Sequence, residues 1–215
     1  MKKIIILLLI AFSSTIFSQN YEFKPKNEEF SKEFLRLVDS ARTVQYGARI
    51  RGEYDNFSKK NVQVKTPFEN TLDSSASLAC AHNNRYFYNL VANQYMDPLI
   101  IGHINVPETS NKKYTGTDPL LRNFVDRCNY YAGDSFFVYG ECVWGGYTTH
   151  PNYKNLNSLE LARYAFNIFM ESKEGHREIL MASAHTKLGI DMMIDPERKR
   201  FYVTVVTGSI KKAKS

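Results

Sequence analysis

The sequence predicts one domain of mixed α and β structure, and three observations support this fold class. Segments whose apolar residues recur every three or four positions are interspersed with shorter runs rich in β-branched and aromatic residues. The chain of 215 residues is long enough to enclose a substantial core. Hydrophobic residues make up 43% of it, as in globular rather than disordered proteins.

The first 18 residues predict a secretory signal peptide. Lys2 and Lys3 precede an apolar run from Ile4 to Phe12, small polar residues follow, and cleavage is expected after Ser18. The apolar run is shorter than the roughly 20 residues of a membrane-spanning helix. No cysteine that could carry a lipid anchor follows this apolar run. We therefore expect a secreted or periplasmic protein with no transmembrane segment after cleavage.

The predicted domain spans residues 30–210 and begins with a helix. Residues 19–29 are polar and are expected to form an N-terminal linker. A helix is predicted at residues 30–42, with Ser31 suited to cap it. Its apolar stripe consists of Phe30, Phe34, Leu37, Val38 and Ala41. Residues 45–70 contain glycines and many charges, and they are expected to form a long irregular connector.

Two further helices are predicted in the middle of the chain. Residues 71–95 show a long amphipathic pattern, and Thr71 or Asp73 suits its N-terminus. Residues 118–128 indicate a short helix, with Asp118 as the cap and a proline at the first helical position. A polar loop separates these two helices.

The C-terminal half alternates between strand and helix patterns. The aromatic run at residues 136–146 predicts a strand that is interrupted by glycines. A helix follows at residues 156–171, capped by Asn157 or Ser158, and residues 176–183 either extend it or begin a new helix.

An antiparallel hairpin is predicted to end the domain. Its strands are residues 187–195 and 201–210, joined by a short polar turn. The alternation of side chains puts Val203, Val205 and Thr207 on one face, and Thr204 and Val206 on the other.

The charge of the mature chain is close to balanced. The leader carries two lysines and no acidic residue. The mature chain therefore has 26 basic and 22 acidic residues, which gives a formal net charge of +4. Lys211, Lys212 and Lys214 all lie in a basic tail, residues 211–215. Such a tail is able to contact an anionic envelope or wall polymer, although many basic tails are only solvated ends. No basic stripe indicates nucleic-acid binding.

Three cysteines are an odd number for an exported protein. Cys128 and Cys142 flank a predicted turn, so a disulfide between them is the natural expectation. Cys80 lies in a helical pattern of small residues and is expected to be a buried thiol. Three free thiols are the alternative.

The histidines suggest a site, but their spacing alone does not define one. His103 and His176 each follow a glycine, and Glu141 follows another. Imidazole and carboxylate groups bind zinc or copper and also transfer protons. The sequence lacks HExxH, CxxC, GxSxG and Gly-rich phosphate-loop motifs. His82 lies at the margin of a helical stripe, where a packing or surface role is expected.

Residues 169–190 resemble the C-terminal signature of the CAP superfamily, also called the SCP domain. This superfamily includes cysteine-rich secretory proteins, antigen five and plant pathogenesis-related proteins. The matching residues are Phe169, Ser172, Gly175, His176, Arg177, Ile179, Leu180, Leu188, Gly189 and Ile190. The segment "YGECVWGG" is similar to the family's Gly-Glu-Asn segment, and the first two predicted helices resemble the family's opening helices. The resemblance runs from about residue 30 to about residue 208.

The resemblance implies a fold and a site. The fold is a three-layer α-β-α sandwich with a central antiparallel sheet. The site is a cleft that gathers two histidines and two acids, which match His103, Glu141 and His176 and, for the second acid, Glu171 or alternatively Glu174. His103, His176 and Glu141 would hold a divalent metal such as zinc, with water in an open position.

The chain departs from the family pattern at three places. Cys142 stands where the family has asparagine, and a disulfide to Cys128 would tie the Glu141 strand in place. Phe169 replaces the usual tryptophan, and the segment from about Tyr46 to Asn70 is longer than the usual connector. Tyr139 and Trp144 beside Glu141 would either line the cleft or belong to the core.

The expected function is that of a non-enzymatic secreted binding protein. Its His/Glu cleft would bind a divalent metal or a small ligand. The alternative is a metal-dependent hydrolase or peptidase, with Glu141 or Glu171 as the base. A third possibility is a structural module that contacts a lipid, an envelope component or a host surface. Nucleic acid is not an expected partner.

Overall fold

The computed structural model describes residues 25–55, 58–92, 123–146, 155–195 and 198–210. A sheet of four strands forms the middle of the molecule. In spatial order its strands are β3 (Thr71–Leu72), β5 (Lys187–Asp195), β6 (Arg200–Ser209) and β4 (Phe137–Trp144). The three long strands are antiparallel to one another, whereas the short β3 pairs parallel to β5.

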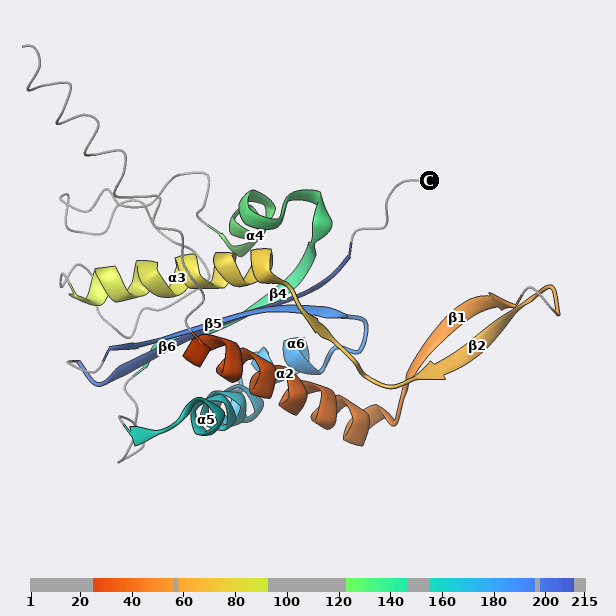
Figure 1. The fold of residues 1–215 in the computed structure, drawn as a ribbon, viewed down its shortest axis with the longest axis horizontal. Helices are drawn as coiled ribbons and strands as arrows, with labels where there is room; N and C mark the ends of the chain where they lie inside the picture. Colours follow the sequence, from red (N-terminus) through yellow and green to blue (C-terminus); the bar gives the residue numbers. More distant parts are fainter. Residues whose placement is uncertain (1–24, 56–57, 93–122, 147–154, 196–197, 211–215) are drawn as a thin grey trace, which may run out of the picture.

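Helices cover the sheet on both faces (Figure 1). On one face lie α2 (Pro25–Tyr46), α5 (Ser158–Glu171) and α6 (His176–Met181). On the other lie α3 (Ser74–Ala92) and α4 (Phe124–Ala132), with the short 3-10 helix η2 (Gly133–Ser135) after it. The prediction of an α+β fold, with a sheet between two helical layers, is confirmed.

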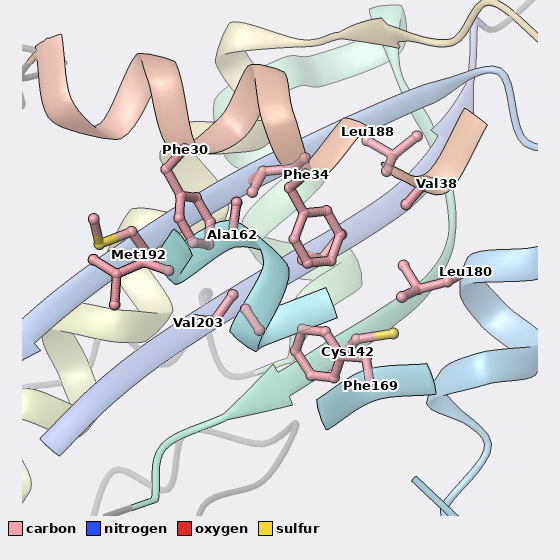
Figure 2. Close-up of a cluster of buried hydrophobic side chains, with 14 of the residues drawn as sticks. Phe30, Phe34, Val38, Cys142, Ala162, Phe169, Leu180, Leu188, Met192 and Val203 are labelled. Atoms are coloured by element: carbon pink, nitrogen blue, oxygen red, sulfur yellow. The ribbon is translucent and has the colours of Figure 1, made fainter. Parts of the chain in front are cut away.

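The main core fills the space between α2, α5 and the sheet (Figure 2). Phe30, Phe34 and Val38 recur every four residues along α2 and are fully buried. The Phe34 ring meets the Phe169 ring of α5 edge to face, with centroids 6.1 Å apart. The apolar stripe predicted for the first helix therefore faces the sheet.

The predicted C-terminal hairpin is confirmed as β5 and β6. Val203 and Val205 belong to the main core, whereas Val206 belongs to the cluster beneath α3 and α4. The alternation that the sequence predicts thus supplies apolar side chains to both helical layers. An irregularity between Val138 and Gly140 shifts the register of β4 against β6.

Side chains from both helical layers bind the edge of β5 where β3 has ended. The Ile190 N–H donates to Ser77 Oγ of α3 at 3.0 Å. The Ile190 carbonyl accepts a hydrogen bond from Ser31 Oγ of α2 at 3.4 Å. Ser31 therefore does not cap a helix, as the sequence suggested, but covers a strand edge that would otherwise be unpaired.

The first helix starts earlier than predicted. It begins at Pro25, inside the segment 19–29 that was expected to be a linker. Proline is favoured in the first turn of a helix because its missing N–H has no partner there. Glu28 and Lys32 form an i,i+4 ion pair at 2.6 Å, and Asn27 is buried against the sheet. These contacts stabilise the first five residues of α2 as helix, although their polar composition predicted a linker.

The prediction of an irregular connector at residues 45–70 is wrong. Strands β1 (Arg49–Asp55) and β2 (Lys60–Thr66) form an antiparallel hairpin that projects from the domain (Figure 1). Its apolar residues are divided between the two faces: Ile50 and Tyr54 pair with Lys65 and Asn61, and Val62 and Val64 pair with Glu53 and Arg51. Because neither face is consistently apolar, the alternation that identifies a strand is weak here.

The helix termini follow capping chemistry. Asp73 Oδ1 accepts a hydrogen bond from Ala76 N at the start of α3, and Asn157 and Glu160 form a capping box at the start of α5, as predicted. In contrast, α4 begins at Phe124 with Asn123 as its cap. The expected cap Asp118 lies outside the described residues. Residues 176–181 form a separate helix rather than an extension of α5.

We predict that Gly189→Ala destabilises the fold because α3 lies directly against β5 at this position. A Cβ atom at Gly189 would lie 2.5 Å from the carbonyl carbon of Ala76. Overpacking of this kind costs about 1–3 kcal/mol or more. Urea denaturation measures the loss. Gly52→Ala is the control, because a Cβ there meets nothing within 4 Å. Equal stability of the two variants would contradict the close packing.

Candidate functional site

His176 is the first residue of α6, and its position depends on the glycine before it. Gly175 has φ +84°, a conformation that side-chain-bearing residues rarely adopt. The chain reverses there between α5 and α6, and Ser172 Oγ accepts a hydrogen bond from Glu174 N. The His176 ring lies against the Phe169 ring, with centroids 5.2 Å apart and an interplanar angle of 72°. The side chain is buried at the interface of α5 and α6.

Glu141 is buried in β4 and is bound by an arginine. Its Oε1 accepts a hydrogen bond from Arg127 Nη2 of α4 at 2.7 Å, and both side chains are almost fully removed from solvent. A charge-assisted hydrogen bond offsets the cost of burying each charge. The sequence analysis missed Arg127. A signal existed, since Arg127 falls on the same helical stripe as Phe124, Cys128 and Tyr131, where an arginine requires an acidic partner.

Glu141 points from β4 toward α3 and α4, whereas His176 lies on the opposite face of the same strand. Glu141 pairs with Val206, which belongs to the cluster beneath α3 and α4. The next residue, Cys142, faces the main core, and its Sγ donates a hydrogen bond to the His176 carbonyl at 3.5 Å. The backbone of His176 is therefore adjacent to β4, which is the outer strand of the described sheet. The structure brings these two predicted residues to one strand.

The other predicted site residues are more peripheral or lie beyond the described ranges. Glu171 ends α5 and is exposed, and Glu174 is exposed in the turn that follows. His103 lies outside the described residues. Within the described part of the chain, no group of three or more His, Cys, Asp or Glu side chains is positioned to hold a metal ion.

The two aromatic residues considered for the cleft wall have different surroundings. Tyr139 is half exposed and stacks on the His185 ring, with centroids 4.7 Å apart and nearly parallel planes. Trp144 packs against the main core. Of the two expected roles, Trp144 therefore has the role of a core residue. Tyr139 belongs to the surface at the opposite end of β4.

The expected disulfide between Cys128 and Cys142 does not form, and all three cysteines are free and buried. Cys128 shares a cluster with Cys80 between α3 and α4, whereas Cys142 faces the main core on the other side of the sheet. Burial raises the pKa of the Cys128 thiol to about 12 and raises the pKa of Cys80 and Cys142 as well. The neutral thiol is therefore the favoured form of all three cysteines.

A second buried carboxylate, which the sequence analysis also missed, lies on β5. Asp191 is fully buried and accepts hydrogen bonds from Asn84 Nδ2 at 2.8 Å and from Asn27 Nδ2 at 3.4 Å. Thr204 and Asn83 extend the network along α3. Burial raises the pKa of Asp191 to about 7, and the hydrogen bonds from the Asn84 amide and the Met192 backbone only partly oppose this rise.

We predict that Asp191→Asn changes how stability depends on pH. Asp191 has a pKa of about 7 in the folded protein and an ordinary value of 3.8, so its contribution to stability is lost as pH rises from about 4 to 7. His185 acts oppositely, since burial lowers its pKa from 6.5 to about 4 and stability is lost as pH falls through that range. The variant should therefore gain stability with rising pH more steeply, by up to about 1.4 kcal/mol per pH unit.

Urea denaturation at several pH values between 4 and 8 measures this slope for the variant and the wild type. His185→Gln is the opposing control and should make the slope more negative. Parallel profiles of the wild type and Asp191→Asn would contradict the assignment.

We predict that Arg127→Met strongly destabilises the protein, because it removes the guanidinium charge that binds the buried Glu141 carboxylate. Loss of one member of a buried ion pair costs on the order of 3–5 kcal/mol. The double variant Arg127→Met/Glu141→Leu should recover part of the loss, since no charge is then left buried. Denaturant unfolding measures both. A single variant within 1 kcal/mol of the wild type, an order-of-magnitude limit for exposed pairs, would show that the pair is not essential.

Comparisons with known proteins do not assign a family. No protein-family model matches the chain, and no curated protein matches it significantly. The chain is similar to an outer surface protein from Borrelia burgdorferi, at 15% identity and a TM-score of 0.48, over 85% of this chain and 94% of that chain. This likeness is too weak to support an argument about function. Among the described helices, none combines the length and apolar character needed to cross a membrane.

Proposed function

We propose that the protein is a secreted or periplasmic member of the CAP superfamily whose cleft binds a divalent metal ion or a small ligand without catalysis. One observation supports the proposal: Glu141 and His176, distant in sequence and both buried, lie on the two faces of the same stretch of the outer strand β4, His176 through its backbone carbonyl. The two residues are those that the family resemblance assigns to the cleft. His103 is proposed as the third member.

The donor chemistry fits a weakly held ion such as zinc. Zinc binds imidazole nitrogen and carboxylate oxygen, with water completing the coordination. Arg127 contacts Oε1 of Glu141, and an ionised carboxylate is able to accept several contacts at once. The guanidinium charge nearby opposes a divalent cation, so we expect reversible binding rather than a permanently held structural ion.

The surroundings of the two acids favour binding over hydrolysis. A metal-dependent hydrolase requires a general base within reach of a metal-bound water. One oxygen of Glu141 already accepts a hydrogen bond from Arg127, and Glu171 is exposed at the end of α5. Neither acid lies in the desolvated and otherwise uncommitted environment that is typical of a catalytic base.

A second candidate function is that of a structural surface module, and the Arg127–Glu141 ion pair favours it. The pair links α4 to β4 inside the protein. If that is its whole role, then the cleft residues maintain the fold and the protein acts through its surface, for example on an envelope or host component. Metal binding distinguishes the two candidates.

Calorimetry with zinc on residues 19–215 tests the proposal. We expect the wild type to bind zinc with a stoichiometry near one, and the His103→Ala/His176→Ala variant to lose at least about ten-fold in affinity, because two ligands are removed. His82→Ala is the matched control. It also removes an imidazole from a partly buried position, where Nδ1 lies 3.0 Å from the Tyr131 hydroxyl.

Circular dichroism establishes that each variant is folded, and His176→Gln provides a milder change if the double variant unfolds. Equal zinc binding by the wild type and the folded double variant would refute the metal site. Zinc binding that the His82→Ala change removes instead would place the site on α3. Absence of binding to the wild type would favour the structural candidate.

A further inference from the structure

The hairpin of β1 and β2 forms a sheet of its own. Its two strands pair with each other and with no other strand among the described residues. Ile50 and Tyr54 lie on one face of β1, and their side chains are 60% and 57% exposed. A two-stranded hairpin is only marginally stable alone, and an open strand edge is a template for pairing with another chain. The hairpin is therefore suited to accept a further strand.

The base of the hairpin is anchored in the domain. Arg49 Nη2 donates to Asn70 Oδ1 at 3.1 Å and to the His185 carbonyl at 3.0 Å. The same guanidinium lies over the Phe68 ring, 5.3 Å from its centroid. From this base the two strands project away from the helices (Figure 1). A strand that is held at its base loses less conformational freedom on binding than a mobile loop would.

The charges of β1 are arranged symmetrically about Gly52. The strand reads "RIRGEYD", with two arginines before Gly52 and two acids after it. Antiparallel pairing of β1 with a second copy of itself, with Gly52 opposite Gly52, places every arginine opposite an acid. The facing residues are then Arg49 and Asp55, Arg51 and Glu53, and Ile50 and Tyr54. A shift of two residues in either direction would place two arginines or two glutamates opposite each other, so the charge pattern specifies one register.

The second strand of the hairpin does not have this property. Strand β2 reads "KNVQVKT", with two lysines and no acid, so pairing with a copy of itself brings no opposite charges together. Both lysines, Lys60 and Lys65, are exposed. Lysines on an edge strand oppose pairing with other chains. The edge that is suited to a second copy is therefore that of β1.

The charged groups of β1 are able to contact a second copy without losing the contacts within their own chain. Asp55 Oδ2 accepts a hydrogen bond from Ser58 N at 3.1 Å, and a carboxylate accepts several contacts at once. Arg49 has five N–H donors, of which Nη2 makes the contacts at the hairpin base. Pairing therefore adds contacts to both groups.

We propose that the protein forms a two-fold symmetric dimer in which β1 pairs antiparallel with β1 of a second copy, with Gly52 at the symmetry axis. The two hairpins become one sheet of four strands, and one of its faces carries Ile50 and Tyr54 from both copies. A two-fold interface requires a self-complementary surface, which the charge pattern of β1 provides and an unrelated partner would not need. The pairing is independent of the proposed metal cleft. Because a single strand pair is a small interface, we expect reversible association on the order of tens of micromolar.

Analytical ultracentrifugation of residues 19–215 tests the proposal. We expect the wild type to show a monomer–dimer equilibrium at protein concentrations between about 1 μM and 1 mM. Arg51→Glu and Glu53→Arg should each weaken the dimer by at least about ten-fold, because each places two like-charge pairs at the interface. The two substitutions change the net charge in opposite directions. An equimolar mixture of the two variants should recover the wild-type affinity, because every facing pair in the mixed dimer is again oppositely charged.

Two further variants separate the edge of β1 from the rest of the hairpin. Ile50→Ser/Tyr54→Ser removes the apolar side chains of the proposed interface and should weaken the dimer by at least about ten-fold. Lys65→Glu is the matched control, because it makes the same change of charge as Arg51→Glu at an exposed position on β2. It should dimerise like the wild type within about two-fold, an ordinary margin for a substitution outside an interface. Circular dichroism establishes that each variant is folded.

Several outcomes would overturn the proposal. A wild type that stays monomeric over the whole concentration range would exclude the dimer. Dimers that persist in both charge variants, or a mixture that associates no more tightly than its components, would exclude the antiparallel pairing of β1. Equal losses in Lys65→Glu and Arg51→Glu would show that the association depends on overall charge and not on the facing residues of β1.

Discussion

The buried guanidinium of Arg42 holds together the segments on which the arrangement of α6 depends. Its Nε donates to the Leu180 carbonyl at 2.8 Å, and its Nη1 donates to the His185 carbonyl at 2.8 Å and to Asn70 Oδ1 at 3.1 Å. Burial lowers its pKa to about 10, which leaves it charged at neutral pH. Asp39, bound to Asn70, provides the compensating charge. Arg42 thereby joins α2, the C-terminal end of α6 and the loop before β5.

The parts of the fold that sequence reasoning predicted correctly are those specified by neighbouring residues. The capping box of Asn157 and Glu160 and the alternating pattern of β6 depend on short-range chemistry, which a sequence displays directly. Contacts such as Arg127–Glu141 or Asn27–Asp191 join residues that only the tertiary fold brings together. The start of α2 was predicted to be a linker for the same reason, because tertiary contacts stabilise it and its local sequence does not indicate a helix.

For the candidate site, the sequence identified individual residues but not how the fold arranges them. The glycines before Glu141 and His176 drew attention to both residues, and both are buried beside β4. The prediction of a disulfide was wrong because residues that are close in sequence can point to opposite faces of a sheet. Cys142 is adjacent in sequence to Glu141 but points to the opposite layer, whereas Cys128 lies on α4 in the same layer as Glu141.

Glu141 and Asp191 are two of the carboxylates that the sheet buries, and their surroundings differ. Asp191 lies on β5, where neutral amides from helices on both faces bind it, and its raised pKa reflects this enclosure. Glu141 lies on the outer strand and has a cationic partner, so its charge is compensated without enclosure by both helical layers. The two carboxylates therefore differ in how their burial is compensated: Glu141 by the charge of Arg127, and Asp191 by neutral amides and a raised pKa.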